Sequence, residues 1–394
     1  METKICPGFK AAGVASGLKK NGKKDLGIIC SEAPAAVAGM FTSNLVKAAP
    51  VLLDQQRIKK GSCRVIVVNS GNANCCTGEQ GMKDAVRMAR IAAEGISVAE
   101  EDVLVASTGV IGAPLPVEKI EAAMPDLIKT LSGDGISDFA EAIMTTDTVP
   151  KVVSCSGELD GDNFTVTGVA KGAGMIRPDM ATMLCFIMTD IQAVAGMLQE
   201  MLATAVNRSL NRITVDGDTS TNDTVLLMAG GHSRIELMGD KQRDIFQSVL
   251  DDVLVRLSKW LIKDGEGATK LVEIVVKGAR SKQDAHKIAD TVANSPLFKT
   301  ALFGEDANWG RILAAAGRAG IPVDPEKIDI FFGSAQMVKK GIGCGTQAEA
   351  EATRVLKQDE FTVTINLNLG QETDAVFTCD FSLDYVKINA DYRT

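Results

Sequence analysis

Apolar runs of the β type alternate with segments of helical periodicity along all 394 residues, and this alternation limits the folds open to the chain. "LGIIC" (26–30) and "RVIVVN" (64–69) are typical of buried strands, whereas 80–94 and 241–263 repeat apolar residues at helical spacing. Further strands are predicted at 102–107, 151–157, 164–170, 183–188, 270–276, 328–333, 361–367 and 375–382. Further helices are predicted at 117–130, 194–208, 282–294, 308–319 and 346–356.

The order of these elements is mixed, which favours an α+β or α/β layered sandwich over a repeated strand–helix unit. The runs at 151–157 and 164–170 flank "ELDGDN", which predicts a hairpin. The last two strands predict a second antiparallel pair, joined by "NLGQETD". The length is ample for two domains, and we expect the boundary between them within 190–280.

Composition excludes several classes of partner. A net charge of −8 disfavours nucleic acid and anionic membranes, and aromatic residues at 4% leave few platforms for stacking bases. The chain shows no secretory leader and no apolar stretch long enough to span a membrane, so we expect a cytoplasmic protein. Nine scattered cysteines without a C-x-x-C spacing predict reduced thiols and no metal site.

Two familiar patterns are present but incomplete. "GLKKNGKK" (17–24) has the glycine and lysine spacing of a phosphate-binding loop, but Lys24 stands where Ser or Thr would bind magnesium. "SGLK" (16–19) has the spacing of a serine–lysine acylase, but no K-T-G follows. Neither pattern predicts a site.

Other turns carry hydroxyl or acidic groups that could serve chemistry. "ASTGVIG" (106–112) ends a strand in a Thr-Gly turn whose N–H groups could bind an oxyanion. The alternative is an ordinary turn from a strand into a loop, which the same residues also fit. "NSGNANCCTGEQG" (69–81), "MTTDTVPK" (144–151) and "KDGEGATKL" (263–271) are open to the same two interpretations.

The junction Ala181–Thr182 in "KGAGMIRPDMATMLCFIMTD" joins a glycine-rich loop directly to an apolar strand. A threonine hydroxyl needs a base to become a nucleophile, and the two histidines of the chain belong to no catalytic motif. If the bond before Thr182 is cut, the new α-amine, with a pKa of about 7.7–8.0, can accept the proton. The alternative is that Thr182 is an ordinary residue entering a strand.

"KGAGMIRPDMATML" resembles the self-cleavage motif of the ornithine acetyltransferase family, the bifunctional glutamate N-acetyltransferases of arginine biosynthesis. The likeness extends over the chain through motifs in the same order: "VVNSGNAN", "STGVIG", "TTDTVPK", "TVDGDTSTND", "DGEGATK", "GEDANWGRI" and "NADYRT". The resemblance implies a fold like that of other self-processing N-terminal-nucleophile enzymes. It also implies cleavage between Ala181 and Thr182 into chains 1–181 and 182–394, which pair as a heterodimer and then as a heterotetramer.

The resemblance also implies roles for particular residues. Thr182 would be the nucleophile, and Thr108 with Gly109 would form the oxyanion hole. The substrate would be contacted by Thr145, Lys171, Thr182, Glu266, Asn389 and Thr394. Lys171 can pair with a substrate carboxylate, and Glu266 can meet an ammonium group or move a proton.

The implied reaction moves acetyl from N-acetylornithine to Thr182 and then to glutamate, without a metal or a cofactor. Three alternatives stay open at this point. Acetyl-CoA could be a second donor, water could replace glutamate as it does in an amidase or aminopeptidase, or the chain could bind amino acids without turnover.

Overall fold

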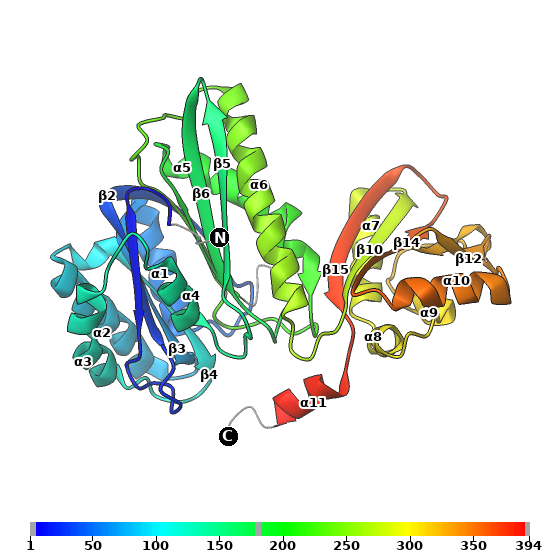
Figure 1. Ribbon diagram of the computed structural model, residues 1–394, viewed down its shortest axis with the longest axis horizontal. Coiled ribbons are helices and arrows are strands. Elements are labelled where there is room, and N and C mark those ends of the chain that lie inside the picture. The colour runs from blue at the N-terminus through cyan, green and yellow to red at the C-terminus, as the bar shows by residue number, and fades with distance from the viewer. Residues whose placement is uncertain (1–4, 178–182, 391–394) are drawn as a thin grey trace. The chain divides into compact units, whose positions relative to one another are not determined.

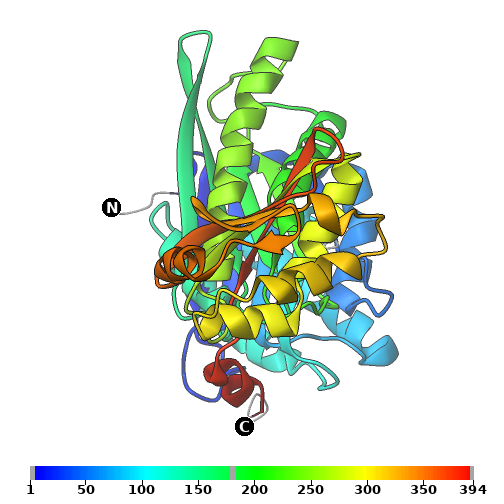
Figure 2. The same cartoon turned by 90° about the vertical axis from the view of Figure 1, so that its right-hand side faces the viewer.

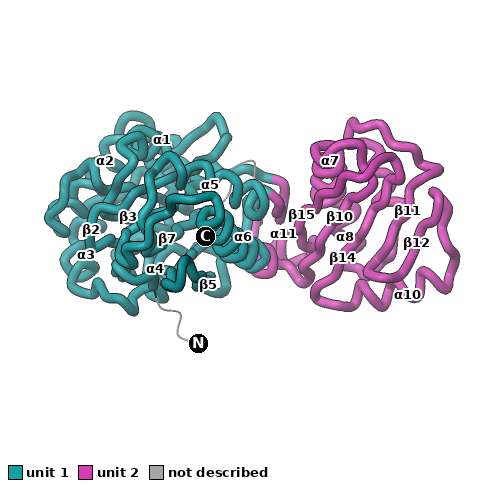
Figure 3. Tube along the Cα trace, turned by 90° about the horizontal axis from the view of Figure 1, so that it is seen from above, with its two compact units in different colours: residues 1–211, 218–261 teal, residues 212–217, 262–394 magenta. Residues whose placement is uncertain are grey.

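The computed structural model of the protein describes residues 5–177 and 183–390. Two compact units make up the chain (Figure 3): unit 1 comprises residues 1–211 and 218–261, and unit 2 comprises residues 212–217 and 262–394. Each unit is built on one mixed sheet with packed helices, which confirms the predicted α+β layering. No helix of the described residues is long and apolar enough to cross a bilayer.

Unit 1 contains most of the secondary structure. Its strands are β1 (Phe9–Val14), β2 (Leu26–Phe41), β3 (Ser62–Asn72), β4 (Val103–Val110), β5 (Lys151–Leu159), β6 (Asp162–Lys171), β7 (Leu184–Thr189) and β9 (Thr224–Ala229). Its helices are α1 (Ala49–Arg57), α2 (Gly78–Ile96), α3 (Val117–Lys129), α4 (Ile136–Ile143), α5 (Ala195–Arg208) and α6 (Asp240–Lys263). Short 3₁₀ turns are η1 (Ile58–Lys60), η2 (Glu100–Asp102), η3 (Leu210–Arg212) and, in unit 2, η4 (Pro325–Lys327).

The sheet of unit 1 has the strand order β4-β3-β2-β9-β7-β6-β5, and β1 pairs with β2. Strand β2 joins its two halves, because residues 26–30 pair with β3 and residues 36–41 pair with β9. The predicted hairpin is confirmed as β5 and β6, which run antiparallel from Lys151↔Ala170 to Leu159↔Asp162. Both views show α6 running beside this hairpin (Figures 1 and 2).

Both faces of β3 and β4 are buried, as their near-continuous apolar sequences require. On one face Val65, Val67 and Val105 pack in a core with α2 and α3. On the other, Ile66 and Leu104 pack in a second core with α4 and with residues of β6, β7 and β9. The second core therefore contains residues from both halves of the sheet.

Unit 2 has a sheet of order β13-β12-β11-β14-β10-β15-β8. Its strands are β8 (Ile213–Thr214), β10 (Leu271–Ala279), β11 (Asp329–Phe332), β12 (Ala335–Lys339), β13 (Ile342–Gly343), β14 (Glu360–Asn366) and β15 (Glu372–Cys379). Its helices are α7 (Lys282–Ala293), α8 (Pro296–Phe303), α9 (Trp309–Gly317), α10 (Thr346–Leu356) and α11 (Leu383–Ala390) (Figures 1 and 2). Residues of α7 to α10 share one apolar core with the strands.

The predicted pairing of the last two strands is wrong. Strand β10 lies between them, parallel to β14 and antiparallel to β15. The loop between β14 and β15 therefore spans one strand instead of closing a hairpin. The pattern of residues in β14 and β15 gave no information on this insertion, because the inserted strand comes from about ninety residues earlier in the chain.

Candidate functional site

The turn Thr108–Gly109 lies at the end of β4, where β4 runs parallel to β3 and the pairing becomes irregular at Gly71 and Asn72. Gly109 has φ +134°, and a Cβ on it would come within 2.3 Å of the carbonyl carbon of Gly71. Only glycine fits this turn without moving the neighbouring strand. Irregular strand pairs of this kind often aim a backbone group out of the sheet, which suits a site that receives an oxyanion.

Buried amides hold this turn in place. Asn222 Nδ2 donates to the carbonyl oxygens of Ser107 at 2.8 Å and Ala73 at 2.6 Å. Ser107 Oγ donates to Asn69 Oδ1 at 2.6 Å, and Asn69 Nδ2 donates to the Asn72 carbonyl at 2.9 Å. The peptide that carries the Thr108 N–H is therefore fixed from two sides, and it needs little rearrangement to meet a developing charge.

Three of the predicted residues meet beside the turn. Lys171 Nζ lies 2.9 Å from Thr145 Oγ1 and 3.4 Å from Thr108 Oγ1. Lys171 is the last residue of β6 and is buried, whereas both threonine side chains are half-buried. Two strand ends and a loop from separate parts of the chain thus bring an ammonium and two hydroxyls together, an arrangement that suits a carboxylate.

Asp147 organises this cluster. Its Oδ1 accepts hydrogen bonds from Gly172 N at 2.6 Å and from Lys151 Nζ at 2.7 Å. Its Oδ2 accepts from Thr145 N at 3.0 Å and lies 3.9 Å from Lys171 Nζ. Burial raises the pKa of Asp147, but the charges of Lys171 and Lys151 outweigh it and hold this pKa at about 2. One ionised carboxylate therefore fixes both Thr145 and Lys171.

In unit 2, the structure brings together two further predicted residues. Asn389 Nδ2, from α11, donates to Glu266 Oε2 at 2.8 Å and to the Tyr385 carbonyl at 3.0 Å. Glu266 is buried, and Asn389 is exposed. A buried carboxylate with an amide partner keeps lone pairs available for an ammonium group.

The remaining predictions, Ala181, Thr182 and Thr394, lie outside the described residues. The first strand after the predicted cleavage site is β7, which begins at Leu184. Its register partner in β6 is Lys171. The strand that follows Thr182 in the sequence thus begins opposite the lysine of the cluster.

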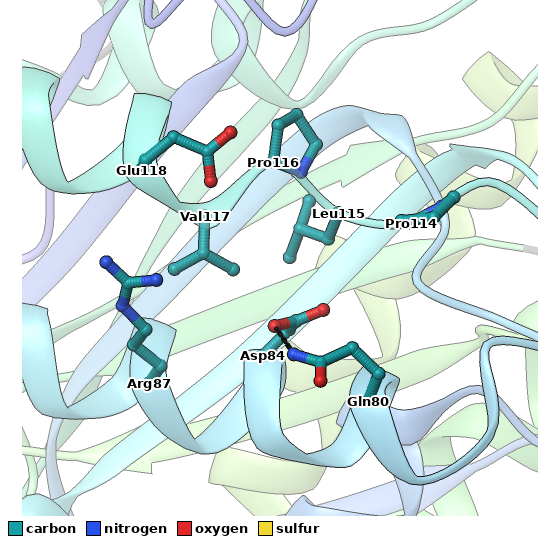
Figure 4. Close-up of a pocket in the computed structure, with 8 residues that line it drawn as sticks. All are labelled: Gln80, Asp84, Arg87, Pro114, Leu115, Pro116, Val117 and Glu118. Carbon is teal, nitrogen blue, oxygen red and sulfur yellow. Dashed lines mark hydrogen bonds between the residues drawn. The ribbon is translucent and has the colours of Figure 1, made fainter.

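A separate cavity of about 340 Å³ lies between α2 and the start of α3 (Figure 4). Asp84, which accepts from Gln80 at 2.8 Å, and the side chains of Arg87 and Glu118 line it. None of the predicted site residues is part of its lining. Among the described residues, no group of three or more His, Cys, Asp or Glu side chains could hold a metal ion.

The sequence motifs did not predict the roles of Asp147 and Asn222, although both residues lie within quoted motifs. Asp147 stands within "TTDTVPK", and Asn222 stands within "TSTND". A short Asp or Asn in a hydroxyl-rich loop is a signal for local hydrogen bonding. The local pattern could not indicate that Asp147 would bind two lysines from separate strands, because those contacts depend on the pairing of β5 with β6.

A glycine turn that carries a hydroxyl, next to a buried lysine, is compatible with acyl-transfer chemistry on a layered α+β fold. Residues 10–394 match the model of the ArgJ family. The arginine biosynthesis bifunctional protein ArgJ of Geobacter sulfurreducens is 51% identical over 389 residues, covering 98% of this chain and 99% of the relative. The protein of the same name from Syntrophotalea carbinolica is also 51% identical over 389 residues, with the same coverage. The chain therefore belongs to the ArgJ family.

A solved structure of a protein from the same family matches part of the chain. The crystal structure of arginine biosynthesis bifunctional protein ArgJ from Bacillus halodurans is 42% identical, with a TM-score of 0.51. The match covers 53% of this chain and 99% of the solved chain, so the solved chain is about half as long.

Proposed function

We propose that the protein transfers acetyl from N-acetylornithine to glutamate in arginine biosynthesis, by a ping-pong reaction through an ester on Thr182. The observation that carries the proposal is the cluster of Lys171, Thr145 and Thr108 beside Gly109, with distances of 2.9 and 3.4 Å from the ammonium to the two hydroxyls. Both amino-acid substrates carry an α-carboxylate, and Lys171 is the group to hold it.

In the first half of the reaction, Thr182 Oγ attacks the acetyl carbon of N-acetylornithine. The α-amine of Thr182, free after self-cleavage, takes the hydroxyl proton and passes it to the departing amine of ornithine. The negative charge of the tetrahedral intermediate develops on the acetyl oxygen. Thr108 and the N–H of Gly109 are the proposed hydrogen-bond donors to that oxygen. The neutral α-amine of glutamate then attacks the ester carbonyl carbon, and the new C–N bond forms as the bond from that carbon to Thr182 Oγ breaks. The Thr182 α-amine passes the proton of the attacking amine to Oγ, and N-acetylglutamate leaves. Glu266 is proposed to meet the ammonium of ornithine.

Self-cleavage is part of this proposal. A cut between Ala181 and Thr182 divides the chain near its middle, and the solved Bacillus halodurans chain, which matches 53% of this chain, has about the length of such a product. We expect the two products, 1–181 and 182–394, to remain paired and two pairs to form a heterotetramer in the cytoplasm. Native mass spectrometry of the purified protein measures this assembly directly.

Intact-mass measurement tests the nucleophile. Wild type should give two chains, Thr182→Ala one chain without transfer activity, and Thr182→Ser, which keeps a hydroxyl, two chains with reduced activity. An uncut wild-type chain with full activity would contradict the mechanism.

Ornithine release separates the transferase from an amidase or aminopeptidase. We expect sustained release of ornithine from N-acetylornithine only when glutamate is present, because the ester then has an acceptor. Release at one rate with and without glutamate would mean that water is the acceptor. The same assay with acetyl-CoA as donor and glutamate as acceptor determines whether the enzyme has a second donor.

A further inference from the structure

The loop of residues 15–25 joins β1 to β2 and carries Lys19, Lys20, Lys23 and Lys24; we call it the lysine loop. Asp25 folds it back, because its buried carboxylate accepts from Ser16 N at 2.5 Å, Ser16 Oγ at 2.7 Å and Lys19 N at 2.8 Å. The Asp25 carbonyl also accepts from Ser70 N at 2.8 Å, next to the site. Three hydrogen bonds therefore fold the loop on itself, and one joins it to β3.

This anchoring brings Lys19 to the Thr108–Gly109 turn. A Cβ on Gly71 would come within 3.3 Å of Lys19 Cγ, so the aliphatic part of Lys19 lies against this glycine. Gly71 is in turn the register partner of Gly109. One residue without a side chain, Gly71, thus lies between the stem of Lys19 and Gly109 of the proposed oxyanion site.

The ammonium of Lys19 lacks the partner that its neighbour has. Lys24 forms ion pairs with Asp138 at 2.5 Å and Glu141 at 2.8 Å. Lys19 Nζ donates to the Lys24 carbonyl at 2.8 Å, and no carboxylate of the described residues lies within ion-pair distance of it. Lys19 thus has no direct ion pair, and the nearby carboxylates act on its half-buried ammonium only at longer range. Ionisable groups perturbed in this way are concentrated at functional sites.

The Lys19 ammonium interacts electrostatically with Lys171 and Asp147 of the cluster. Burial lowers the pKa of Lys19 to about 8; Asp25 and Asp147 oppose this shift, and Lys171 adds to it. The charged groups that act on Lys19 and Asp147 comprise two carboxylates, Asp25 and Asp147, and four lysines, Lys19, Lys23, Lys151 and Lys171. The local balance is positive by two charges (4 − 2) within a protein whose net charge is −8. A local positive excess favours an anionic ligand.

We propose that Lys19 is a specificity residue for the acetyl acceptor, and that its ammonium receives the side-chain carboxylate of glutamate while Lys171 holds the α-carboxylate. This inference rests on the proposed function. Glutamate has one carboxylate more than ornithine, so the acceptor requires a cation that the donor does not. The competing interpretation is structural: Lys19 would only tie the loop to the Lys24 carbonyl.

Glutamine as acceptor separates the two interpretations, because it has the shape of glutamate without the side-chain charge. We would measure kcat/KM for glutamate and for glutamine, with N-acetylornithine as donor, in wild type, Lys19→Met, Lys19→Arg and the control Lys20→Met. Lys20 is exposed in the same loop. The preference for glutamate over glutamine should fall at least about tenfold in Lys19→Met, since a charge-assisted hydrogen bond is lost. Lys19→Arg should retain part of the preference, and Lys20→Met all of it.

Two further readouts make the result decisive. The thermal midpoint of Lys19→Met should equal or exceed that of wild type, and acetyl transfer from N-acetylornithine to the enzyme should change less than about threefold. An unchanged glutamate preference in folded Lys19→Met, or an equal loss for donor and acceptor, would overturn the inference and leave the proposed function intact. A wild-type enzyme that transfers no acetyl to glutamate would overturn both.

Discussion

Two buried lysines, Lys171 in unit 1 and Lys299 in unit 2, differ in what surrounds them. Lys299 is 1% exposed, and its ammonium donates to Thr378 Oγ1 at 2.8 Å and to the Cys379 carbonyl. The ring of Phe381 lies 4.8 Å from it. Lys171 instead meets two half-buried threonine hydroxyls and a carboxylate at 3.9 Å.

Burial of a lysine ammonium therefore does not by itself identify a functional site. The Lys299 ammonium is satisfied by a backbone carbonyl, a core hydroxyl and an aromatic face, which a ligand cannot replace without unfolding the strand end. The hydroxyls beside Lys171 stand at a strand end and a loop, where a substrate carboxylate can take their place. The partners of a buried lysine therefore separate structural from functional use.

Replacing each lysine in turn tests this difference most directly and should have the largest effects. Lys171→Met should reduce kcat/KM for acetyl transfer on the order of a thousandfold, because the ammonium proposed to hold the substrate carboxylate is lost. Lys299→Met should leave the activity of folded enzyme within about twofold but lower the unfolding free energy by about 2 kcal/mol, since its acceptors lose their donor. Steady-state assays and urea titrations of both variants measure these effects. Large activity loss in folded Lys299→Met would contradict the comparison.

A change in the turn beside Lys171 should have the next largest effect. Gly109→Ala places a Cβ 2.3 Å from the Gly71 carbonyl carbon, so the turn must move and kcat should fall about a hundredfold. Gly112→Ala is the matched control, because Gly112 also has positive φ, +86°, but open space around its Cα. Equal losses in the two variants would mean that backbone strain, and not the position of the turn, limits activity.

Asp147 tests whether Lys171 depends on its support. Asp147→Asn removes a buried carboxylate charge that contacts both Lys151 and Lys171, which should lower the unfolding free energy by about 3 kcal/mol. Transfer should fall about tenfold through a higher KM, because Lys171 and Thr145 lose their shared acceptor. Asp134→Asn, at an exposed site, should change neither quantity. A kcat effect without a KM effect would assign Asp147 a different role.

The same carboxylate predicts a pH dependence of stability, which is the smallest of these effects. The pKa of Asp147 is about 2 in the folded protein, below its ordinary value of 3.8. The ionised group therefore stabilises the fold above about pH 4, and this contribution, roughly 2 kcal/mol, is lost as the pH falls through 2. The difference in unfolding free energy between wild type and Asp147→Asn should narrow by that amount between about pH 4 and pH 2. A constant difference would mean that the carboxylate is not held ionised.

Local pattern was sufficient for the elements with strong periodicity. The strands and helices predicted around β3, β5, β6, α2 and α6 are confirmed, because alternation and helical spacing are properties of neighbouring residues. The short elements β1, β9, α1, α4 and α8 were missed, since each is only six to nine residues long and is stabilised by its tertiary packing. The residues Thr108, Gly109, Thr145, Lys171, Glu266 and Asn389 were predicted through ordered motifs, which carry family information and no distances.

The tertiary structure alone decided how these residues meet. The pairing of β5, β6 and β7 places Lys171 beside Thr145 and opposite Leu184, and the insertion of β10 separates β14 from β15. Hydrogen bonds between strands join residues distant in sequence, so no local window contains them. The same holds for Asp147 and Lys19, which lie in separate loops and whose charges interact only in the folded chain. Composition and local pattern specify which chemical groups are present, whereas the long-range packing of the sheet specifies which of them lie together.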